Sequence, residues 1–204
     1  MIDAKRLSSE QLDALREVAN IGSGHAATSL SQLVQARVMV RVPKVITGHL
    51  EEVVTKIAEP SEVVVSVLLY FLGDLSGRTL VIYPYEHAEQ LTSILMPAVQ
   101  DNREEVKESL IKEVSNILSC SYMNALGELL GVLILPSVPG MIVDMVGAVL
   151  SSVMLEFGSE KDFVFCVETE FDFCESRNPL SAYFLLLPDT KSLEIILKKL
   201  NVAK

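Results

Sequence analysis

The sequence is short of cations and cysteine, and it contains no tryptophan. Among its 204 residues, 17 Lys and Arg are outnumbered by 27 Asp and Glu, which gives a net charge of −10. Nucleic-acid binding depends on clustered cations that neutralise phosphates, so this composition predicts no nucleic-acid partner. Half of the residues are apolar, which is enough for a sizeable core. We therefore expect a globular protein whose partners are proteins or small molecules.

The three cysteines, Cys120, Cys166 and Cys174, form no C-x-x-C pair, and one of them stays unpaired in any disulfide pattern. This usage is typical of a reducing compartment. The first residues contain no apolar core of a signal peptide, and we expect a cytoplasmic protein. The three histidines are scattered without a ligand pair at helical spacing, so the sequence predicts no metal site of the protein's own.

One apolar stretch, residues 129–150, has about the length of a membrane-spanning helix. However, Pro136, Pro139 and Gly140 interrupt it near the middle, and Asp144 would place a charge in the apolar phase. The sequence therefore predicts no membrane insertion, and two buried elements joined by a turn explain the stretch.

The sequence repeats a motif at an offset of 96 positions. The first copy contains Asp13, Glu17, Asn20 and Pro43, and the second contains Ser109, Glu113, Asn116 and Pro139. In both copies an apolar helical segment runs from the motif into a β-rich stretch. We interpret the chain as an internal duplication.

Each half has the same predicted order of elements: helix, strand, helix, strand, strand, helix. After the first strand, the first half predicts a helix at 49–58, strands at 62–72 and 78–83, and a helix at 86–96. The second half predicts a helix at 141–154, strands at 162–173 and 182–187, and a helix at 192–200, with 97–105 as the connection. The expected fold class is α+β, with helices packed on a largely antiparallel sheet about a pseudo-two-fold axis. We expect one domain over 1–204, made of repeats at about 1–97 and 98–204.

Asp13, Glu17 and Asn20 are spaced at i, i+4 and i+7, which places them on one face of a helix. An ordinary solvated helix face is one explanation. Asparagine, however, is a poor residue for the middle of a helix, so its recurrence in both copies suggests a function. A carboxamide can hold a water in a fixed direction without titrating, and a carboxylate can act as a base or pair with a cation on a partner.

The repeated pattern D/S-x3-E-x2-N-x22-P resembles the signature of the CheC family of chemotaxis phosphatases, which is related to CheX and FliY. The resemblance implies a hydrolase that removes the phosphoryl group from the aspartyl phosphate of the response regulator CheY. It implies that Asn20 and Asn116 position the attacking water, while Glu17 and Glu113 contact an active-site lysine of CheY. It also implies that CheY supplies the Mg²⁺, so that the protein needs no cofactor of its own.

The remaining motif positions are expected to support these sites. Asp13 and Ser109 would support the helix surface, and Pro43 and Pro139 would shape a turn after the first strand of each half. The segment Gly22-Ser23-Gly24 lacks the spacing of a nucleotide-binding loop, so we predict close helix packing there.

The predicted second helices differ between the halves, because 141–154 is apolar nearly all round whereas 49–58 is amphipathic. The apolar helix is either buried in the core or exposed as a Met-rich contact face. The family resemblance implies the deamidase CheD as a second partner, and Met141, Asp144 and Met145 are candidates for that interface. The alternative to an enzyme is a binding module that recognises phosphorylated CheY or CheD without hydrolysis, and a flagellar switch component is a third hypothesis.

Overall fold

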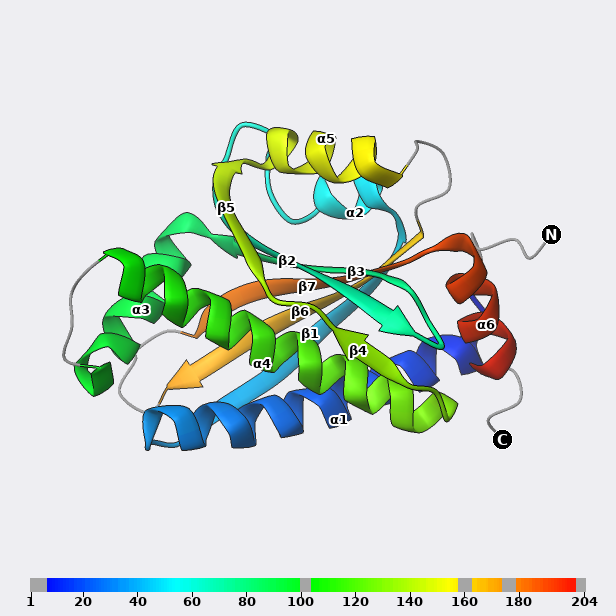
Figure 1. Ribbon diagram of the computed structural model, residues 1–204, viewed down its shortest axis with the longest axis horizontal. Helices are drawn as coiled ribbons and strands as arrows, with labels where there is room; N and C mark the ends of the chain where they lie inside the picture. The colour runs from blue at the N-terminus through cyan, green and yellow to red at the C-terminus, as the bar shows by residue number, and fades with distance from the viewer. Residues whose placement is uncertain (1–6, 100–103, 158–162, 174–178, 201–204) are drawn as a thin grey trace.

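The computed structural model describes residues 7–99, 104–157, 163–173 and 179–200. In chain order its elements are α1 (Ser9–Val34), β1 (Val38–His49), α2 (Leu50–Val54), β2 (Val63–Gly73), β3 (Gly77–Pro84), α3 (Tyr85–Val99), α4 (Glu104–Leu130), β4 (Ile134–Pro136), β5 (Gly140–Met145), α5 (Val146–Phe157), β6 (Phe163–Phe173), β7 (Leu180–Pro188) and α6 (Thr190–Leu200). The strands form one antiparallel sheet of order β1-β6-β7-β3-β2-β4, and β5 also pairs with β2 (Figure 1).

Helices cover both faces of this sheet (Figure 1). The long helices α1 and α4 lie on one face, over a core that includes Leu15, Leu118 and Phe184. The helices α2 and α5 lie on the other face, over a smaller core that includes Val53 and Val149. The helices α3 and α6 lie at opposite ends of the molecule. The prediction of an α+β fold with helices packed on a largely antiparallel sheet is confirmed.

The two halves of the chain exchange strands within the sheet. Strand β1 pairs with β6 of the other half, with Val45 opposite Val167. Strand β5 pairs in turn with β2, with Val143 opposite Val65. Strands β3 and β7 are neighbours at the centre of the sheet. The strand order therefore reads alike from both edges, as a pseudo-two-fold arrangement requires.

The prediction of a helix over 141–154 was wrong in its first part. Gly140–Met145 forms strand β5, and helix α5 begins only at Val146. Pairing with β2 satisfies the main chain of this segment, whose β-branched Ile142 and Val143 favour an extended backbone. The N–H of Val146 then donates to the carbonyl of Glu62 at 2.9 Å, where the chain turns into the helix.

The prediction of a turn at the motif proline after the first strand was wrong for the first half of the chain. Strand β1 continues through Pro43 to His49, and its register against β6 shifts between Arg41 and Lys44. In the second half, residues 137–139, which end at Pro139, separate β4 from β5. Because proline has no N–H to donate, it interrupts the hydrogen-bond ladder of an edge strand without ending the strand direction.

The two longest helices are α1, with 26 residues, and α4, with 27. Helix α1 begins with a capping box, in which the Ser8 side chain accepts from the N–H of Gln11 and the Gln11 side chain accepts from the N–H of Ser8. It ends before Gln35, whose left-handed φ of 52° closes the helix. Within the described residues, no helix combines the length and the apolar character that crossing a membrane requires.

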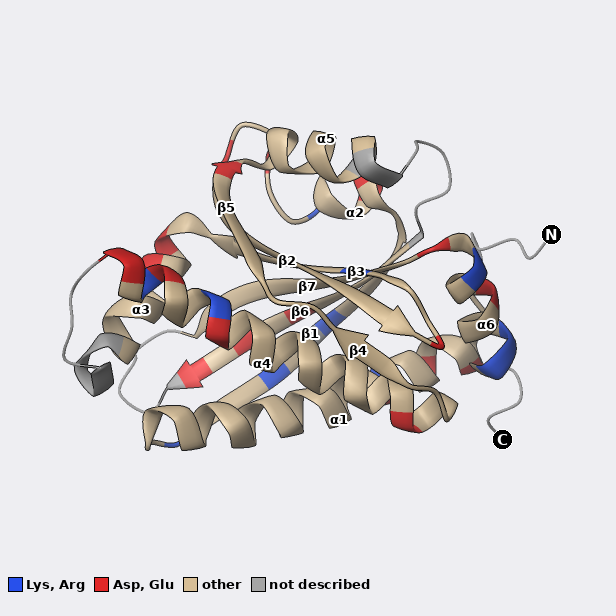
Figure 2. Ribbon diagram, viewed as in Figure 1, with Lys and Arg blue, Asp and Glu red and all other residues tan. Residues whose placement is uncertain are grey.

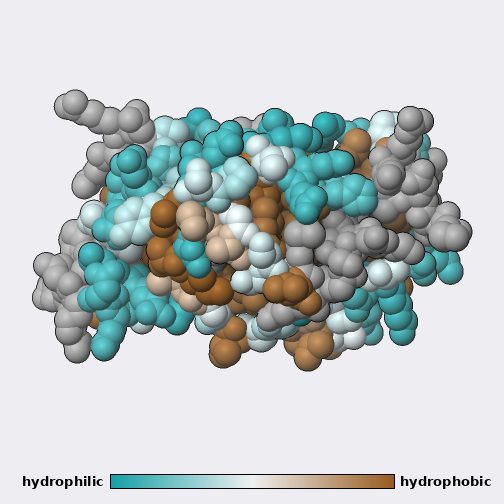
Figure 3. Space-filling model, turned by 90° about the horizontal axis from the view of Figure 1, so that it is seen from above, coloured by the Kyte–Doolittle hydropathy of each residue, from teal (hydrophilic) through white to brown (hydrophobic). Residues whose placement is uncertain are grey.

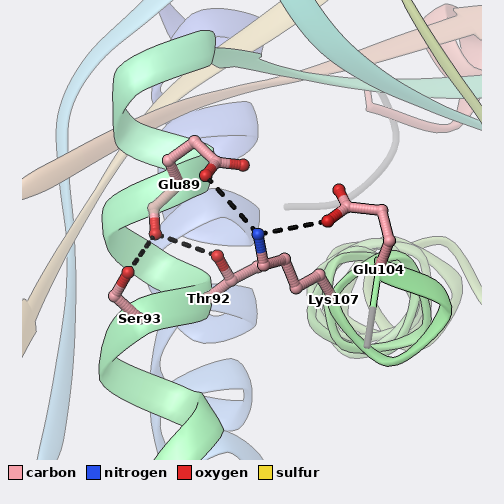
Figure 4. A network of polar contacts seen from close by, with 5 residues as sticks. All are labelled: Glu89, Thr92, Ser93, Glu104 and Lys107. Carbon is pink, nitrogen blue, oxygen red and sulfur yellow. Dashed lines mark hydrogen bonds and ion pairs between the residues drawn. The ribbon is translucent and has the colours of Figure 1, made fainter. Parts of the chain in front are cut away.

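Helix α3 is tied to the first turns of α4 by Lys107 (Figure 4). The Nζ atom of Lys107 lies 3.1 Å from the carboxylate of Glu104 and 3.8 Å from that of Glu89 on α3. The hydrogen bond to Glu104, with the nearby charge of Glu89, raises the pKa of Lys107. The ion pair with Glu89 thus joins α3 to the first turn of α4 at the surface.

Candidate functional site

The two motif helices lie side by side and run in opposite directions (Figure 1). Gly22 of α1 packs against Tyr122 of α4 so closely that a Cβ atom on Gly22 would lie 2.3 Å from Cδ1 of the tyrosine ring. The close packing predicted for the Gly22-Ser23-Gly24 segment is therefore found at Gly22. At Gly24 a Cβ atom would have no neighbour within 4 Å, because this glycine faces outward.

The first motif forms an exposed stripe on α1. Asp13, Glu17 and Asn20 are all exposed, whereas Leu15 and Val18 on the opposite side are buried. Asp13 accepts a hydrogen bond from Arg16 at 2.9 Å. Within the described part of the chain, no side chain bonds to the carboxylate of Glu17 or the carboxamide of Asn20, so both groups face outward without a neighbour that holds them.

The second motif forms a similar stripe on α4 with one difference. Ser109 and Glu113 are exposed, but Asn116 is half-buried. The hydroxyl of Ser109 donates to the carbonyl of Glu105 at 2.8 Å, within its own helix. The thiol of Cys120, one turn beyond Asn116, donates to the Oδ1 atom of Asn116 at 3.5 Å. The second carboxamide is thus held by a neighbour, whereas the first is not.

Each motif glutamate is the last charged residue before a long neutral stretch of its helix. No Asp, Glu, Lys or Arg occurs in residues 18–34 of α1 or in residues 114–127 of α4. Figure 2 shows most of α1 and the middle of α4 without charge. The asparagines therefore lie at the border between a neutral surface and a carboxylate, a setting that suits contact with a partner protein carrying a cation.

Buried hydroxyl groups attach α4 to the sheet beneath the second motif. The Tyr83 hydroxyl lies 2.9 Å from the Oγ of Ser115, and the Oγ1 of Thr79 donates to the Oγ of Ser119 at 3.4 Å. Burial raises the pKa of Tyr83 well above its usual range. Sequence reasoning missed these pairs, because they join residues from separate elements whose packing no motif reveals.

The motif prolines lie apart from these stripes, one within an edge strand of the sheet and the other in the connection before one. Pro43 lies within β1, and Pro139 lies directly before β5. They contribute to the shape of the two sheet edges and add no polar group to the stripes on α1 and α4. The structure therefore brings the Glu and Asn of each motif together on one helix face and leaves the proline on another element.

The residues predicted for a second interface lie on β5. Asp144 and Met145 are exposed, while Met141 is half-buried against the core beneath α1 and α4. The carboxylate of Asp144 accepts from the N–H of Met145 at 2.7 Å. Because side chains alternate along a strand, Asp144 points to the opposite side from the two methionines. The three residues therefore lie along an edge strand rather than on one face of a helix, and of the three only Asp144 and Met145 are exposed.

A cleft of about 530 Å³ opens on the far side of the sheet from the motif helices. Residues of β2, β3 and α3 and of the segment that follows α2 line it, among them Ile57, Val64 and Ile82. Figure 3, a view onto the α2 and α5 side, shows an apolar patch bordered by hydrophilic side chains. Neither motif contributes to this cleft. Across the described residues, no group of three His, Cys, Asp or Glu lies close enough together to hold a metal ion.

Comparison with known proteins agrees with the motif on α1. A model of the CheC-like family matches residues 10–47, which include Glu17, Asn20 and Pro43. The chain is 33% identical over 193 residues to the CheY-P phosphatase CheC of Bacillus subtilis, covering 92% of each protein. The chain belongs to the CheC family.

Solved structures show the same fold for this CheC-family protein. Thermotoga maritima FliY matches with a TM-score of 0.77 and 21% identity over 100% of both chains. A chain of the FliM–SpeE complex from H. pylori matches with a TM-score of 0.70 and 14% identity, covering 97% of this chain and 98% of that one. CheX from Desulfovibrio desulfuricans matches with a TM-score of 0.52 and 14% identity, covering 84% of this chain and 99% of that one. At these identities the matches establish the fold alone.

Proposed function

We propose that the protein is a hydrolase that removes the phosphoryl group from the aspartyl phosphate of the response regulator CheY. The 33% identity to the B. subtilis CheY-P phosphatase over nearly the whole chain supports this function. The observation that carries the mechanism is the repeated placement of an exposed Glu one turn before an Asn, which is exposed on α1 and half-buried on α4, beside the neutral stretches of both helices.

The reaction requires only one group from the phosphatase at the reacting centre. In each site, the carboxamide of Asn20 or Asn116 hydrogen-bonds a water and directs its oxygen at phosphorus, opposite the aspartyl oxygen. A P–O bond to water forms, the P–O bond to the aspartyl group breaks, and the electron pair leaves on the carboxylate. The water loses its proton to solvent or phosphate, and the products are inorganic phosphate and the free aspartate. CheY holds the phosphoryl group and supplies the Mg²⁺ bound to it.

The motif glutamates are proposed to dock the two proteins. Glu17 and Glu113 are exposed, and each lies one turn before its asparagine. A carboxylate in that place can pair with the active-site lysine of CheY, which fixes the asparagine over the phosphoryl group. Docking to CheY then depends on local contacts such as this ion pair. The net charge of −10 gives no long-range attraction to an acidic surface of a partner.

The decisive experiment follows the decay of acyl-phosphorylated CheY at saturating Mg²⁺. We expect the wild type to accelerate decay, Asn20→Ala and Asn116→Ala each to lose part of the acceleration, and the double variant to lose all of it. An exposed asparagine outside the motifs, Asn124, gives the control Asn124→Ala, which should keep full activity. A folded wild-type protein that binds phosphorylated CheY without accelerating its decay would identify a binding module instead.

A contact with CheD through β5 is proposed as a second interaction. Asp144 and Met145 expose a carboxylate and an apolar side chain at an edge of the sheet, next to the start of α5. Exposed methionine adapts its shape to a partner surface, and the carboxylate adds polarity to the contact. This surface lies on an edge strand and is separate from the Glu and Asn stripes.

A further inference from the structure

We propose that Cys120 is a positioning residue of the second site: its thiol holds the carboxamide of Asn116 in the orientation that directs water, so the two sites differ in how far they are preorganised. This inference rests on the proposed hydrolysis of CheY aspartyl phosphate. Cys120 itself does not touch the phosphoryl group. It acts only through Asn116.

The contact between the two side chains is local and specific. Cys120 lies one helical turn beyond Asn116, and its Sγ atom lies 3.5 Å from Oδ1. A thiol donates its proton to the carboxamide oxygen, which leaves the Nδ2 group of Asn116 directed away from the thiol. The contact therefore selects one of the two amide orientations before any partner is bound. Asn116 is also half-buried, which limits its movement further.

Among the described residues, no corresponding hydrogen bond holds the asparagine of the first site. The position that corresponds to Cys120 is Gly24, where an added Cβ atom would have no neighbour within 4 Å. Asn20 is exposed, and no side chain in the described part of the structure holds its carboxamide. Asn20 must therefore lose its rotational freedom when the partner docks, whereas Asn116 has lost much of it already.

The helix is also attached to the sheet more firmly near Asn116 than near Asn20. Ser115 and Ser119, which precede Asn116 and Cys120, lie against Tyr83 and Thr79 of the sheet. The corresponding residues of α1 are Ala19, which offers no hydroxyl, and Ser23, which donates to the carbonyl of Asn20 in its own helix at 2.8 Å. Side-chain hydroxyls therefore attach α4 to the sheet at the site, while the equivalent part of α1 rests on apolar contacts.

The kinetic test compares proteins that keep only one site. In the Asn20→Ala protein, where only the second site operates, Cys120→Ala should lower kcat for hydrolysis of CheY phosphate about fivefold, the effect of one lost neutral hydrogen bond. KM should stay unchanged, because docking does not use the thiol. In the Asn116→Ala protein, where only the first site operates, Gly24→Cys should raise kcat by a similar factor.

A double-mutant cycle separates positioning from structural damage. The effects of Cys120→Ala and Asn116→Ala should be strongly non-additive, because the thiol acts through the carboxamide alone. A purely structural role would lower the activity of both sites and add to the loss from Asn116→Ala. If adding Cys120→Ala to the Asn20→Ala protein leaves kcat unchanged, the inference is overturned.

A second measurement needs no catalysis. Side-chain amide relaxation by NMR should show Asn116 more ordered than Asn20 in the isolated protein, and Cys120→Ala should reduce the order of Asn116 to that of Asn20. If this order changes as expected but the wild type does not hydrolyse CheY phosphate, the proposed function fails and the positioning contact stands. If the order of Asn116 does not depend on Cys120, the positioning contact itself is refuted.

Discussion

Gly22 of α1 lies directly against the ring of Tyr122 on α4, with room for no further carbon atom between them. This contact joins the two adjacent helices that each carry a copy of the motif. We expect Gly22→Ala to lower the free energy of unfolding by about 1–3 kcal/mol, because the added methyl group forces the helices or the ring to shift. Urea unfolding followed by circular dichroism measures the change.

The matched control is Gly24→Ala, two residues along the same helix. Its added methyl group meets open space, so replacing glycine should raise helix stability by about 0.5–1 kcal/mol. Changes of opposite sign in the free energy of unfolding would support the close contact between Gly22 and Tyr122. A loss of stability at both positions would show that glycine is needed for another reason.

The glutamates should affect docking more than chemistry. Glu17→Gln together with Glu113→Gln keeps the shape of both sites but removes the charge proposed to meet a lysine of CheY. We expect KM for phosphorylated CheY to rise about tenfold with a much smaller change in kcat, as for loss of a charge-assisted hydrogen bond. Steady-state phosphate release provides the measurement. An unchanged KM with a reduced kcat would assign the carboxylates to the chemical step.

The buried tyrosines should make the fold sensitive to alkaline pH. Burial raises the pKa of both Tyr83 and Tyr122, each of which is also hydrogen-bonded to a hydroxyl. Unfolded tyrosine releases its proton near pH 10, whereas the folded protein retains it to higher pH, so the free energy of unfolding should fall as the pH rises above about 10. Urea unfolding at a series of pH values tests this slope, and Tyr83→Phe should make it shallower. A slope that Tyr83→Phe leaves unaltered would contradict the assignment.

The β5 edge should matter for CheD and not for CheY. Asp144→Lys reverses an exposed charge beside Met145, and we expect it to weaken CheD binding about tenfold while hydrolysis of CheY phosphate persists. Glu128→Lys, an equally exposed charge reversal on α4, is the control. Isothermal titration calorimetry with purified CheD would decide, and unchanged affinity in the Asp144→Lys protein would exclude this surface.

Sequence periodicity predicted the helical stripes well, because their geometry depends only on residues within one helix. Asp13, Glu17 and Asn20 share a face of α1 as their spacing requires. The Cys120 contact follows from the same one-turn rule applied to Asn116, but a single half-buried thiol gives little sign of its role. The pairing of Tyr83 with Ser115 depends on how α4 lies over β3, which no local pattern contains.

The segment around Met141 shows why the sheet edge was harder to predict. A mostly apolar segment fits a buried helix as well as a strand, and the element that it pairs with decides between the two. That partner is β2, whose paired residues lie 72 to 82 positions earlier in the chain, and pairing with it gives Gly140–Met145 an extended backbone. The turn predicted at Pro43 was wrong for a related reason, because an edge strand can accept a proline that a central strand would not.

The exchange of strands between the halves has a consequence for how the chain holds together. Neither half can complete its own part of the sheet, since β1 lies beside β6 and β5 lies beside β2. This pairing has the strand exchange of an intertwined dimer within one polypeptide, in which a covalent connection would keep each half at a high effective concentration near the other. After a protease cut in this connection, the two fragments should stay associated through their paired strands. Each fragment expressed alone should associate with a second copy of itself, which would supply the missing strands.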